Sequence, residues 1–397
     1  MTTNLSRDAR SRAFHWFGKK RGPGTLLAMM ICAGVSLGVP AAVALEDVLV
    51  TPSMATQKAT ESLLLDVAVA GASYVAVGER GHAIYSTDGG VTWQQGAVPV
   101  STTLTSVFFV DEQYGWAVGH GGVILSTSDG GRQWVKQFDG NLANQMVIQA
   151  AESRVKRIES ELDAAADDDK GDIEAALEEA QFALEDAKTD AATGPSKPLL
   201  DVWFKDRNLG FVVGAYGFCF KTTDGGQTWE NWAPKLENPD RFHLNAIGRI
   251  TGDALFLVGE GGMIFSSTDF GDSWKRLESP YEGSLFGLTG TGNVNEVLVF
   301  GLRGHVFKSV DLGRTWEKVE SGTTATLSAG APGEAGNVTL VGAQGVVAVS
   351  NNSGDSFIAK ERADRLALTA IAHRKDQALL LFGEGGVVIA NSKGNDL

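Results

Sequence analysis

Cysteine and basic residues are both scarce in this chain. Its 397 residues include two cysteines, Cys32 and Cys219, and 34 Lys and Arg against 48 Asp and Glu, a formal net charge of −14. We expect Cys32 to leave with an N-terminal leader, which excludes an intramolecular disulfide. Cys219, between Phe218 and Phe220, is expected to be a small buried hydrophobic residue. The negative charge disfavours nucleic acid and anionic lipid as partners, because both require a positive surface.

Residues 1–44 have the composition of a signal peptide. Six basic residues precede an uncharged apolar stretch over 25–39, and Ala42-Val43-Ala44 predicts cleavage before Leu45. The alternative is an uncleaved anchor in the inner membrane, since residues 25–45 carry no charge and are long enough to span a bilayer. Both readings predict an exported, periplasmic protein. Cleavage would leave 28 basic and 47 acidic residues, a net charge of −19.

Glycine is abundant, with 49 residues, and much of it falls in one repeated stretch. In the first copy, Val-Gly-x-x-Gly at 77–81 precedes a short apolar run. The closing glycine recurs at intervals of 41, 95, 45, 42, 41 and 41 residues, at Gly81, Gly122, Gly217, Gly262, Gly304, Gly345 and Gly386. A period of about 40–45 residues with strand-turn-strand texture is typical of one propeller blade per repeat. We therefore predict an all-β, seven-bladed β-propeller over residues 45–397.

The second half of the repeat is Ser-x-Asp-x-Gly-x-x-Trp. The aspartate can accept backbone N–H groups across a hairpin turn, and the tryptophan can pack between blades. Aspartate and tryptophan stand five residues apart in five copies, Asp88/Trp93, Asp129/Trp134, Asp224/Trp229, Asp269/Trp274 and Asp311/Trp316. The pattern weakens at Asn352/Phe357 and is lost at Lys393/Leu397.

These two motifs together, behind inner strands such as 107–111 and 202–206, resemble the photosystem II stability/assembly factor family of Asp-box (BNR) propellers. The resemblance covers nearly all of the chain after the leader. It implies an exported seven-bladed scaffold without catalytic activity that helps a membrane complex assemble. Relatives in non-photosynthetic bacteria are linked to resistance-nodulation-division type exporters, so the resemblance implies a transporter or a photosystem-type client. We expect a transporter, because Arg80, Arg303, Arg362 and Arg365 are dispersed in an acidic chain.

Residues 141–196 interrupt the repeat with a helical pattern. Apolar residues recur at spacings of three and four, at Ile148, Ala151, Val155, Ile158, Leu162 and Ala165 and then at Ile173, Leu177, Ala180, Leu184 and Ala187. The pattern predicts two helices joined by the polar turn 167–172, a coiled-coil hairpin inserted between blades 2 and 3. Residues 150–190 contain 14 acidic and five basic side chains.

The connection that holds this hairpin emerges on the face of the Val-Gly-x-x-Gly turns, so we expect the hairpin to stand over them. The predicted partner-binding face consists of residues in these turns and in neighbouring connections, Glu79, Arg80, His120, Tyr216, Glu260, Arg303, Gln344, Glu384, Arg241 and Arg365. A mixed polar and aromatic surface of this kind favours docking of a protein partner. The alternative is a solvated loop face and an arm with no partner.

One position in the first strand of each repeat is polar in six of seven copies, and Phe286 is the exception. The polar residues are Asp66, Ser106, Asp201, Asn245, Ser328 and Thr369. We expect this position to line a water-filled central channel. Two carboxylates there, and no histidine pair at ligand spacing, lead us to predict no metal and no cofactor. We also expect residues 47–50 to pair with the last blade as its outer strand and so to close the ring.

A carbohydrate-active propeller, sialidase-like or of another glycosidase class, or a carbohydrate-binding one is the alternative function. A sialidase would need an arginine triad and a tyrosine nucleophile, but the chain has five tyrosines and no Arg-Ile-Pro motif. Glu79, Glu260 and Glu384 occupy equivalent turns, which indicates a role in the turns rather than catalysis. We predict that the protein is not an enzyme and has no small-molecule substrate.

Overall fold

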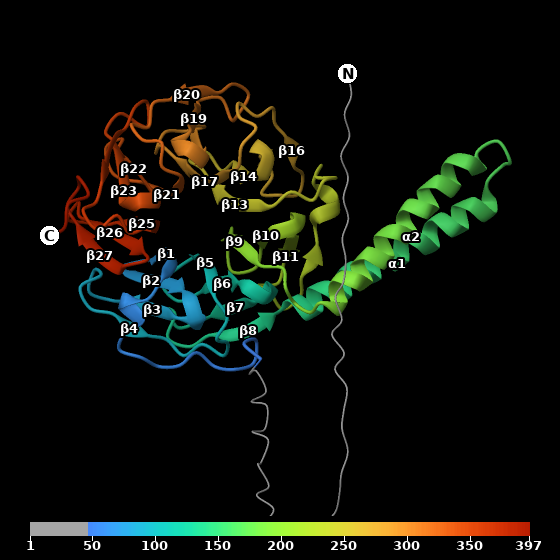
Figure 1. Ribbon diagram of the computed structural model, residues 1–397, viewed down its shortest axis with the longest axis horizontal. Helices are drawn as coiled ribbons and strands as arrows, with labels where there is room; N and C mark the ends of the chain where they lie inside the picture. The colour runs from blue at the N-terminus through green and yellow to red at the C-terminus, as the bar shows by residue number, and fades with distance from the viewer. Residues whose placement is uncertain (1–46) are drawn as a thin grey trace, which may run out of the picture. The chain divides into compact units, whose positions relative to one another are not determined.

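The computed structural model describes residues 47–397, so the predicted leader and Cys32 lie outside the described residues. The described chain is mostly β, with seven antiparallel sheets that follow one another around a central axis (Figure 1). Neighbouring strands in each sheet are consecutive in sequence. This arrangement fits a seven-bladed propeller. Within residues 47–397, no helix is long and apolar enough to cross a membrane.

We number the sheets in chain order. Sheet 1 contains β1 (Leu64–Ala70), β2 (Ser73–Gly78), β3 (Ala83–Ser86) and β4 (Gln94–Gln95). Sheet 2 contains β5 (Leu104–Phe109), β6 (Gly115–Gly119), β7 (Ile124–Thr127) and β8 (Val135–Phe138). Sheet 3 contains β9 (Leu199–Phe204), β10 (Gly210–Gly214), β11 (Cys219–Thr222) and β12 (Glu230–Asn231). Sheet 4 contains β13 (Leu244–Arg249), β14 (Leu255–Gly259), β15 (Ile264–Ser267) and β16 (Lys275–Arg276).

Sheet 5 contains β17 (Leu285–Gly290), β18 (Val297–Gly301), β19 (Val306–Ser309) and β20 (Glu317–Val319). Sheet 6 contains β21 (Leu327–Pro332), β22 (Val338–Gly342), β23 (Val346–Ser350) and β24 (Ile358–Glu361). Sheet 7 has three strands, β25 (Leu368–His373), β26 (Leu379–Gly383) and β27 (Gly386–Ala390). Short 3-10 turns complete the set, η1 (Ala59–Glu61), η2 (Glu79–Gly81), η3 (His120–Gly122), η4 (Ala215–Gly217), η5 (Ala233–Lys235), η6 (Glu260–Gly262), η7 (Leu302–Gly304) and η8 (Ala343–Gly345).

The hydrophobic core of the ring is divided into seven clusters that each lie between two adjacent sheets. The second strand of each of sheets 2 to 7 is buried along its length, since it is covered on both faces by neighbouring sheets. Sheet 7 packs on sheet 1 in the same way, with Phe382 and Leu380 against Tyr74 and Ile84. Cys219 is fully buried, which confirms its expected place in the core, and burial raises its pKa to about 12.

The predicted inner strands are correct in identity but displaced in sequence. β5 and β9 end at Phe109 and Phe204, so Asp111 and Asp206 lie in the turns that follow. Each carboxylate accepts two backbone N–H groups of its turn, at 2.8 Å from both Gln113 and Tyr114 in the case of Asp111. These aspartates therefore end the strands rather than belong to them.

The predicted outer strand at residues 47–50 is wrong. These residues form a turn beside sheets 1 and 2, where Leu49 is 3% exposed and its carbonyl accepts a hydrogen bond from Lys136 Nζ at 2.9 Å. The chain then runs along the outside of sheet 1, where Thr56 N–H donates to Gln95 Oε1 at 2.9 Å. It reaches η1, which packs against β27. The N-terminal strap, residues 47–61, thus contacts sheets 2, 1 and 7 without adding a strand.

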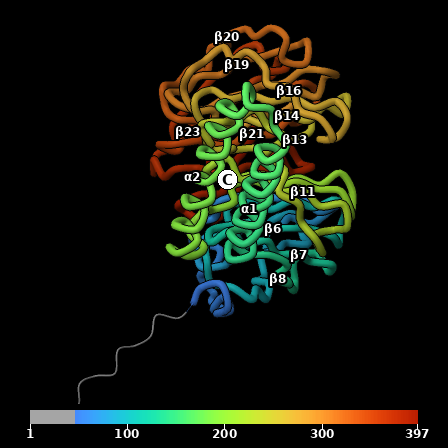
Figure 2. The backbone as a smooth tube through the Cα atoms, turned by 90° about the vertical axis from the view of Figure 1, so that its right-hand side faces the viewer, coloured from blue at the N-terminus to red at the C-terminus, as the bar shows by residue number. Residues whose placement is uncertain are grey.

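The insertion forms two helices, α1 (Gly140–Ala164) and α2 (Lys170–Ala192), which pack side by side as an antiparallel hairpin (Figures 1 and 2). Val155, Ile158 and Ala180 are buried between them. The hairpin begins beside η3, on the side of the Val-Gly-x-x-Gly turns. Its expected direction is wrong, however, because it extends outward past the edge of the ring instead of over the turns (Figure 1).

Candidate functional site

The turns between the second and third strands of the sheets form one face of the ring, which we call the turn face. Each turn closes on a glycine with positive φ, such as Gly81 at 71°. A Cβ atom at Gly81 would lie 2.2 Å from the carbonyl oxygen of Val100, so the next connection packs directly on the turn. The repeated glycine is therefore required by both backbone conformation and space.

In six of the seven turns the middle residue also has positive φ, the exception being Gly385 of sheet 7. It is glycine at η3 and η6, but Arg80 at 55°, Tyr216 at 56°, Arg303 at 57° and Gln344 at 60° occupy it in the other four. All four side chains are exposed. A residue with a Cβ costs about 1 kcal/mol in this conformation, whereas glycine does not. These side chains are therefore retained at some cost in stability.

Two further arginines on the turn face share this conformation. Arg241 (φ 53°) lies beside Gly217, and Arg365 (φ 56°) lies beside Gly345. Arg365 donates to Gln344 Oε1 at 2.7 Å and pairs with Glu361, while Arg241 lies 3.6 Å from Asp186 of α2. Within residues 47–397, Arg80 and Arg303 form no ion pair. The turn face thus presents four arginines of an otherwise acidic chain.

The three predicted turn glutamates serve the backbone. Glu79, Glu260 and Glu384 each accept a hydrogen bond from the N–H that precedes a first strand, at 3.3 Å from Leu63, 3.2 Å from His243 and 3.1 Å from Ala367. Their equivalent positions already indicated this role. His120 is exposed at the start of η3, and Tyr216 is 54% exposed, with its ring 5.1 Å from that of His243.

Turns with an aspartate or asparagine occupy the opposite end of the sheets. In sheet 1, Ser86 Oγ donates to Asp88 Oδ1 at 2.8 Å, and Thr92 N–H and Oγ1 donate to the same carboxylate at 2.9 and 2.6 Å. The pattern recurs around Asp129, Asp224, Asp269, Asp311 and Asn352. The Thr315 N–H and then its hydroxyl lower the pKa of Asp311 to about 2. These carboxylates are committed to turn structure.

The tryptophan that follows each aspartate turn packs between two sheets. In each of sheets 1 to 5, the tryptophan ring belongs to the apolar cluster that the sheet shares with the preceding one. The five residues, in chain order, are Trp93, Trp134, Trp229, Trp274 and Trp316. Trp93 meets Phe382 of sheet 7 edge to face, with ring centroids 5.8 Å apart, and Trp274 meets Phe211 of sheet 3 at 6.0 Å. The side chain therefore fastens one sheet to the next.

The indole N–H groups of these tryptophans do not share one role. Those of Trp93 and Trp134 donate to the carbonyls of Gly90 and Gly131, both at 3.1 Å. The indole N–H groups of Trp229, Trp274 and Trp316 have no hydrogen-bond acceptor in the described chain. Phe357 takes the same place between sheets 5 and 6 without an N–H group. The position thus requires an aromatic ring, and the hydrogen bond is secondary.

The seven residues expected in the channel line a central cavity of about 220 Å³. Ser106 Oγ lies 2.7 Å from both Asp66 Oδ2 and Asp201 Oδ1. A hydroxyl donates one proton, so both contacts are hydrogen bonds only if one carboxyl group is protonated and donates to Ser106. Burial raises the pKa of Asp66 to about 6; burial and then the charge of Asp66 raise that of Asp201 to about 7.

The same two carboxylates connect neighbouring sheets. Asp66 accepts the N–H of Val107 at 2.9 Å, and Asp201 accepts that of Ile247 at 2.8 Å. The cluster therefore links the first strands of sheets 1 to 4. Sequence reasoning placed these side chains in the channel but missed this structural role, which an aspartate inside an apolar strand could have suggested.

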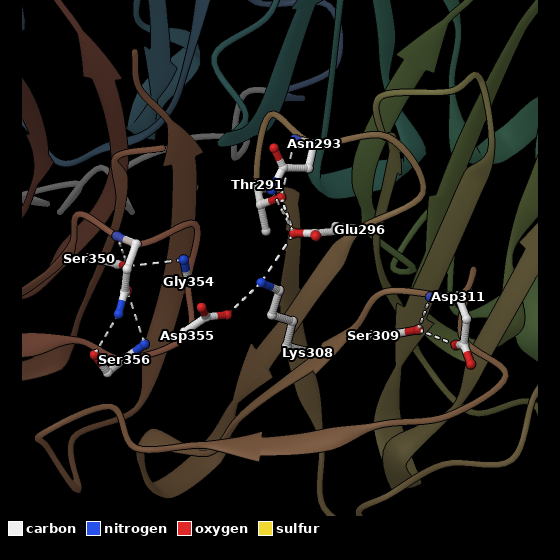
Figure 3. A network of polar contacts seen from close by, with 11 residues as sticks. Thr291, Asn293, Glu296, Lys308, Ser309, Asp311, Ser350, Gly354, Asp355 and Ser356 are labelled. Atoms are coloured by element: carbon white, nitrogen blue, oxygen red, sulfur yellow. Dashed lines mark hydrogen bonds and ion pairs between the residues drawn. The ribbon is translucent and has the colours of Figure 1, made fainter. Parts of the chain in front are cut away.

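A second polar network was not predicted. Lys308 Nζ lies 3.1 Å from Glu296 and 2.7 Å from Asp355, the latter in the turn of the adjacent sheet (Figure 3). Glu296 also accepts from Thr291 Oγ1 at 2.7 Å. Lys221 and Asp272 form the equivalent pair between sheets 3 and 4 at 2.6 Å. The signal was present in the repeat, because each lysine precedes the Ser or Thr of its turn.

Comparison with known proteins assigns the family. A family model described as photosynthesis system II assembly factor YCF48 matches residues 48–139, 91–160 and 183–397. The chain belongs to this family. A photosystem II assembly lipoprotein Ycf48 of Prochlorococcus marinus (strain MIT 9313) is 37% identical over 65 residues, which cover 14% of this chain and 19% of that relative. The chain is thus aligned to about a fifth of that relative's length.

Solved structures share the fold of this family member. YCF48 bound to D1 peptide has a TM-score of 0.55 at 15% identity, over 83% of this chain and 93% of that chain. A streptogramin B lyase has a TM-score of 0.59 at 9% identity, over 86% and 98%. At these identities the similarity concerns the fold alone. The same fold therefore serves an assembly factor and an enzyme.

Proposed function

We propose that this protein is a non-enzymatic, exported assembly factor that binds a component of a membrane complex through its turn face. The observation that carries the proposal is the set of exposed arginines with positive φ, Arg80, Arg241, Arg303 and Arg365. Backbone strain that does not serve stability points to a functional side chain. Because guanidinium groups bind carboxylates in a bidentate manner, we expect an acidic partner segment.

Family membership supports the assembly role, and the D1 peptide in the related structure supports a peptide segment as ligand. The client is inferred from the resemblance to relatives in non-photosynthetic bacteria, which favours a transporter. The composition of residues 1–44 supports export to the periplasm. We also infer that the ring is closed between sheets 7 and 1, where Thr369 Oγ1 donates to Leu64 O at 2.6 Å, and that the aspartate turns with their tryptophans are Asp-boxes.

The absence of catalysis is part of the proposal. The glutamates on the turn face are hydrogen-bonded to backbone, and the aspartates at the opposite end maintain turns. The carbohydrate-active alternative predicts hydrolysis of fluorogenic glycosides by residues 45–397, lost on Glu79→Gln or Glu260→Gln. Such turnover would refute the scaffold function.

The binding proposal is tested by affinity purification from solubilised membranes of the organism that encodes the protein. Wild-type protein is compared with Arg80→Gly/Arg303→Gly, which removes two charges without straining the backbone. The control, Lys275→Ala/Arg314→Ala, removes two exposed charges toward the other end of the sheets. We expect a membrane complex to be recovered with wild type and control and lost with the glycine variant. Equal recovery with all three proteins would contradict a role for the turn face.

A further inference from the structure

The helical hairpin is held firmly at its base. Asp139 caps α1 by accepting the N–H groups of Asn141 and Leu142 at 3.0 and 3.4 Å. Ala143 is buried in the core between sheets 2 and 3, in the same cluster as Phe138 and Phe218. At the other end, Lys197 pairs with Asp190 of α2. The base of the hairpin is therefore anchored to the ring, from which the two helices project (Figure 2).

Phe182 of α2 does not contribute to the packing of the hairpin. The two helices contact each other through Val155, Ile158 and Ala180, with Leu177 and Leu184 packed against them. Phe182 follows Ala180 by two residues, which places it on the opposite side of α2. Its side chain is 74% exposed. An exposed phenylalanine on a helix whose core is complete without it has no structural role in the described chain.

Acidic side chains surround this phenylalanine. Glu178 and Glu179 lie one turn before it, and Glu185 and Asp186 lie one turn after it, at the spacings that place side chains side by side on a helix. All four are exposed. Glu179 pairs with Arg154 of α1 and Asp186 with Arg241 of the ring, whereas Glu178 forms no ion pair within residues 47–397. Glu185 contacts Lys188 on its own helix at 3.0 Å.

We infer that the outer face of α2, centred on Phe182 and flanked by Glu178 and Glu185, binds a basic amphipathic segment of a protein partner. An apolar side chain of that segment packs on the phenylalanine ring, and its lysines or arginines pair with the two glutamates. A membrane surface is the wrong occupant, because anionic lipid headgroups repel this face. The surface is separate from the turn face and opposite to it in charge, so it does not depend on the function proposed above.

The inference is tested by fluorescence anisotropy with residues 45–397 and a labelled helical peptide of about 14 Leu and Lys residues, with Leu at spacings of three and four so that one face of the helix is apolar. We expect Phe182→Ala to weaken binding about tenfold, and Glu178→Lys/Glu185→Lys to weaken it about a hundredfold. Ile358→Ala, which also truncates an exposed apolar side chain, and Glu230→Lys/Glu317→Lys, which makes the same charge swap, are controls at exposed sites of the sheets. They should change the affinity by less than about twofold.

Three results would overturn the inference. Equal loss with the control charge swap would mean that the peptide binds only to the net charge of the chain. Equal binding of a Leu/Glu peptide would rule out charge complementarity. Binding of the wild type to vesicles containing anionic lipid, lost on Phe182→Ala, would identify a membrane as the occupant. Phe182, Glu178 and Glu185 lie outside the core of the hairpin, so we expect each variant to remain folded. Circular dichroism of each variant checks this expectation.

Discussion

Asp201→Asn should change how the stability of the ring depends on pH. Asp201 has its pKa raised from an ordinary value of 3.8 to about 7, by burial first and then by the charge of Asp66. A carboxyl group with a raised pKa binds protons more tightly in the folded chain than in the unfolded chain. Its contribution to stability is therefore present at low pH and is lost as the pH rises from about 4 to 7.

The size of the effect follows from this shift. Between pH 5 and pH 7, one carboxyl group of this kind lowers the free energy of unfolding by at most about 2.7 kcal/mol. Because Asp66 ionises in the same pH range, its charge is only partly present between pH 5 and pH 7, and the expected value is about 1–2 kcal/mol. Asparagine removes the titration but keeps an oxygen for the N–H of Ile247 and an amide group that can donate to Ser106. It loses one backbone hydrogen bond, at a cost of about 1 kcal/mol.

The assay is urea denaturation of residues 45–397 at pH 5 and pH 8. The wild type should lose stability between these values, while Asp201→Asn should be less stable than wild type or equal to it at pH 5 and more stable at pH 8. Asp168→Asn, in the exposed turn of the hairpin, controls for removal of one negative charge from an acidic chain. If both variants show the same pH dependence, or if the wild type shows none, a protonated carboxyl group beside Ser106 is refuted.

Three further outcomes concern stability. Deletion of residues 47–58 should lower the free energy of unfolding by about 3 kcal/mol, because it exposes the apolar site of Leu49 to water. Met54→Ala, at an exposed position of the strap, should leave the free energy of unfolding unchanged. An unaltered urea midpoint in the deletion variant would show that the strap does not stabilise the ring. Lys308→Met should lower the free energy of unfolding by about 2–3 kcal/mol, because it leaves Glu296 without its cation (Figure 3). Lys318→Met, at an exposed position, should lower it by less than about 0.5 kcal/mol. Comparable losses for the two variants in urea titrations would contradict a stabilising role for the Lys308 network. Arg80→Gly/Arg303→Gly should gain about 1 kcal/mol, because the roughly 2 kcal/mol relieved at two left-handed residues is partly offset by the larger entropy that glycine loses on folding. A lower melting temperature would mean that these arginines stabilise the ring.

The repeat was predictable because its physical requirements are local. A tight turn needs glycine where φ is positive and neighbouring backbone approaches, and Gly81 meets both conditions. The strap was not predictable in this way. Residues 47–50 could pair with any free strand edge, and the choice depends on Leu49 finding an apolar site beside sheet 2 and on Lys136 reaching its carbonyl. Such contacts between distant segments leave no periodic signal.

The sequence predicted which residues lie at the candidate site better than it predicted what each side chain does there. The equivalent positions of Glu79, Glu260 and Glu384 indicated turn chemistry, and the hydrogen bonds show it. Nothing in the sequence distinguished Arg80 from any other turn arginine, because φ depends on the conformation that the flanking strands impose. The direction of the hairpin was equally hidden, since it is set by packing at its base rather than by the pattern along its helices.

The outward direction of the hairpin decides whether two surfaces of opposite charge can coexist. An arm with 14 acidic residues placed over the turn face would lie within a Debye length of about 8 Å of the arginines there and would pair with them. In the described chain, one ion pair joins α2 to that face, Asp186 to Arg241 at 3.6 Å. Arg80 and Arg303 remain available for an acidic segment, and Glu178 and Phe182 for a basic one. An arm that is anchored at its base and points away from the ring would therefore let one protein hold two differently charged segments at once, as the two binding proposals require.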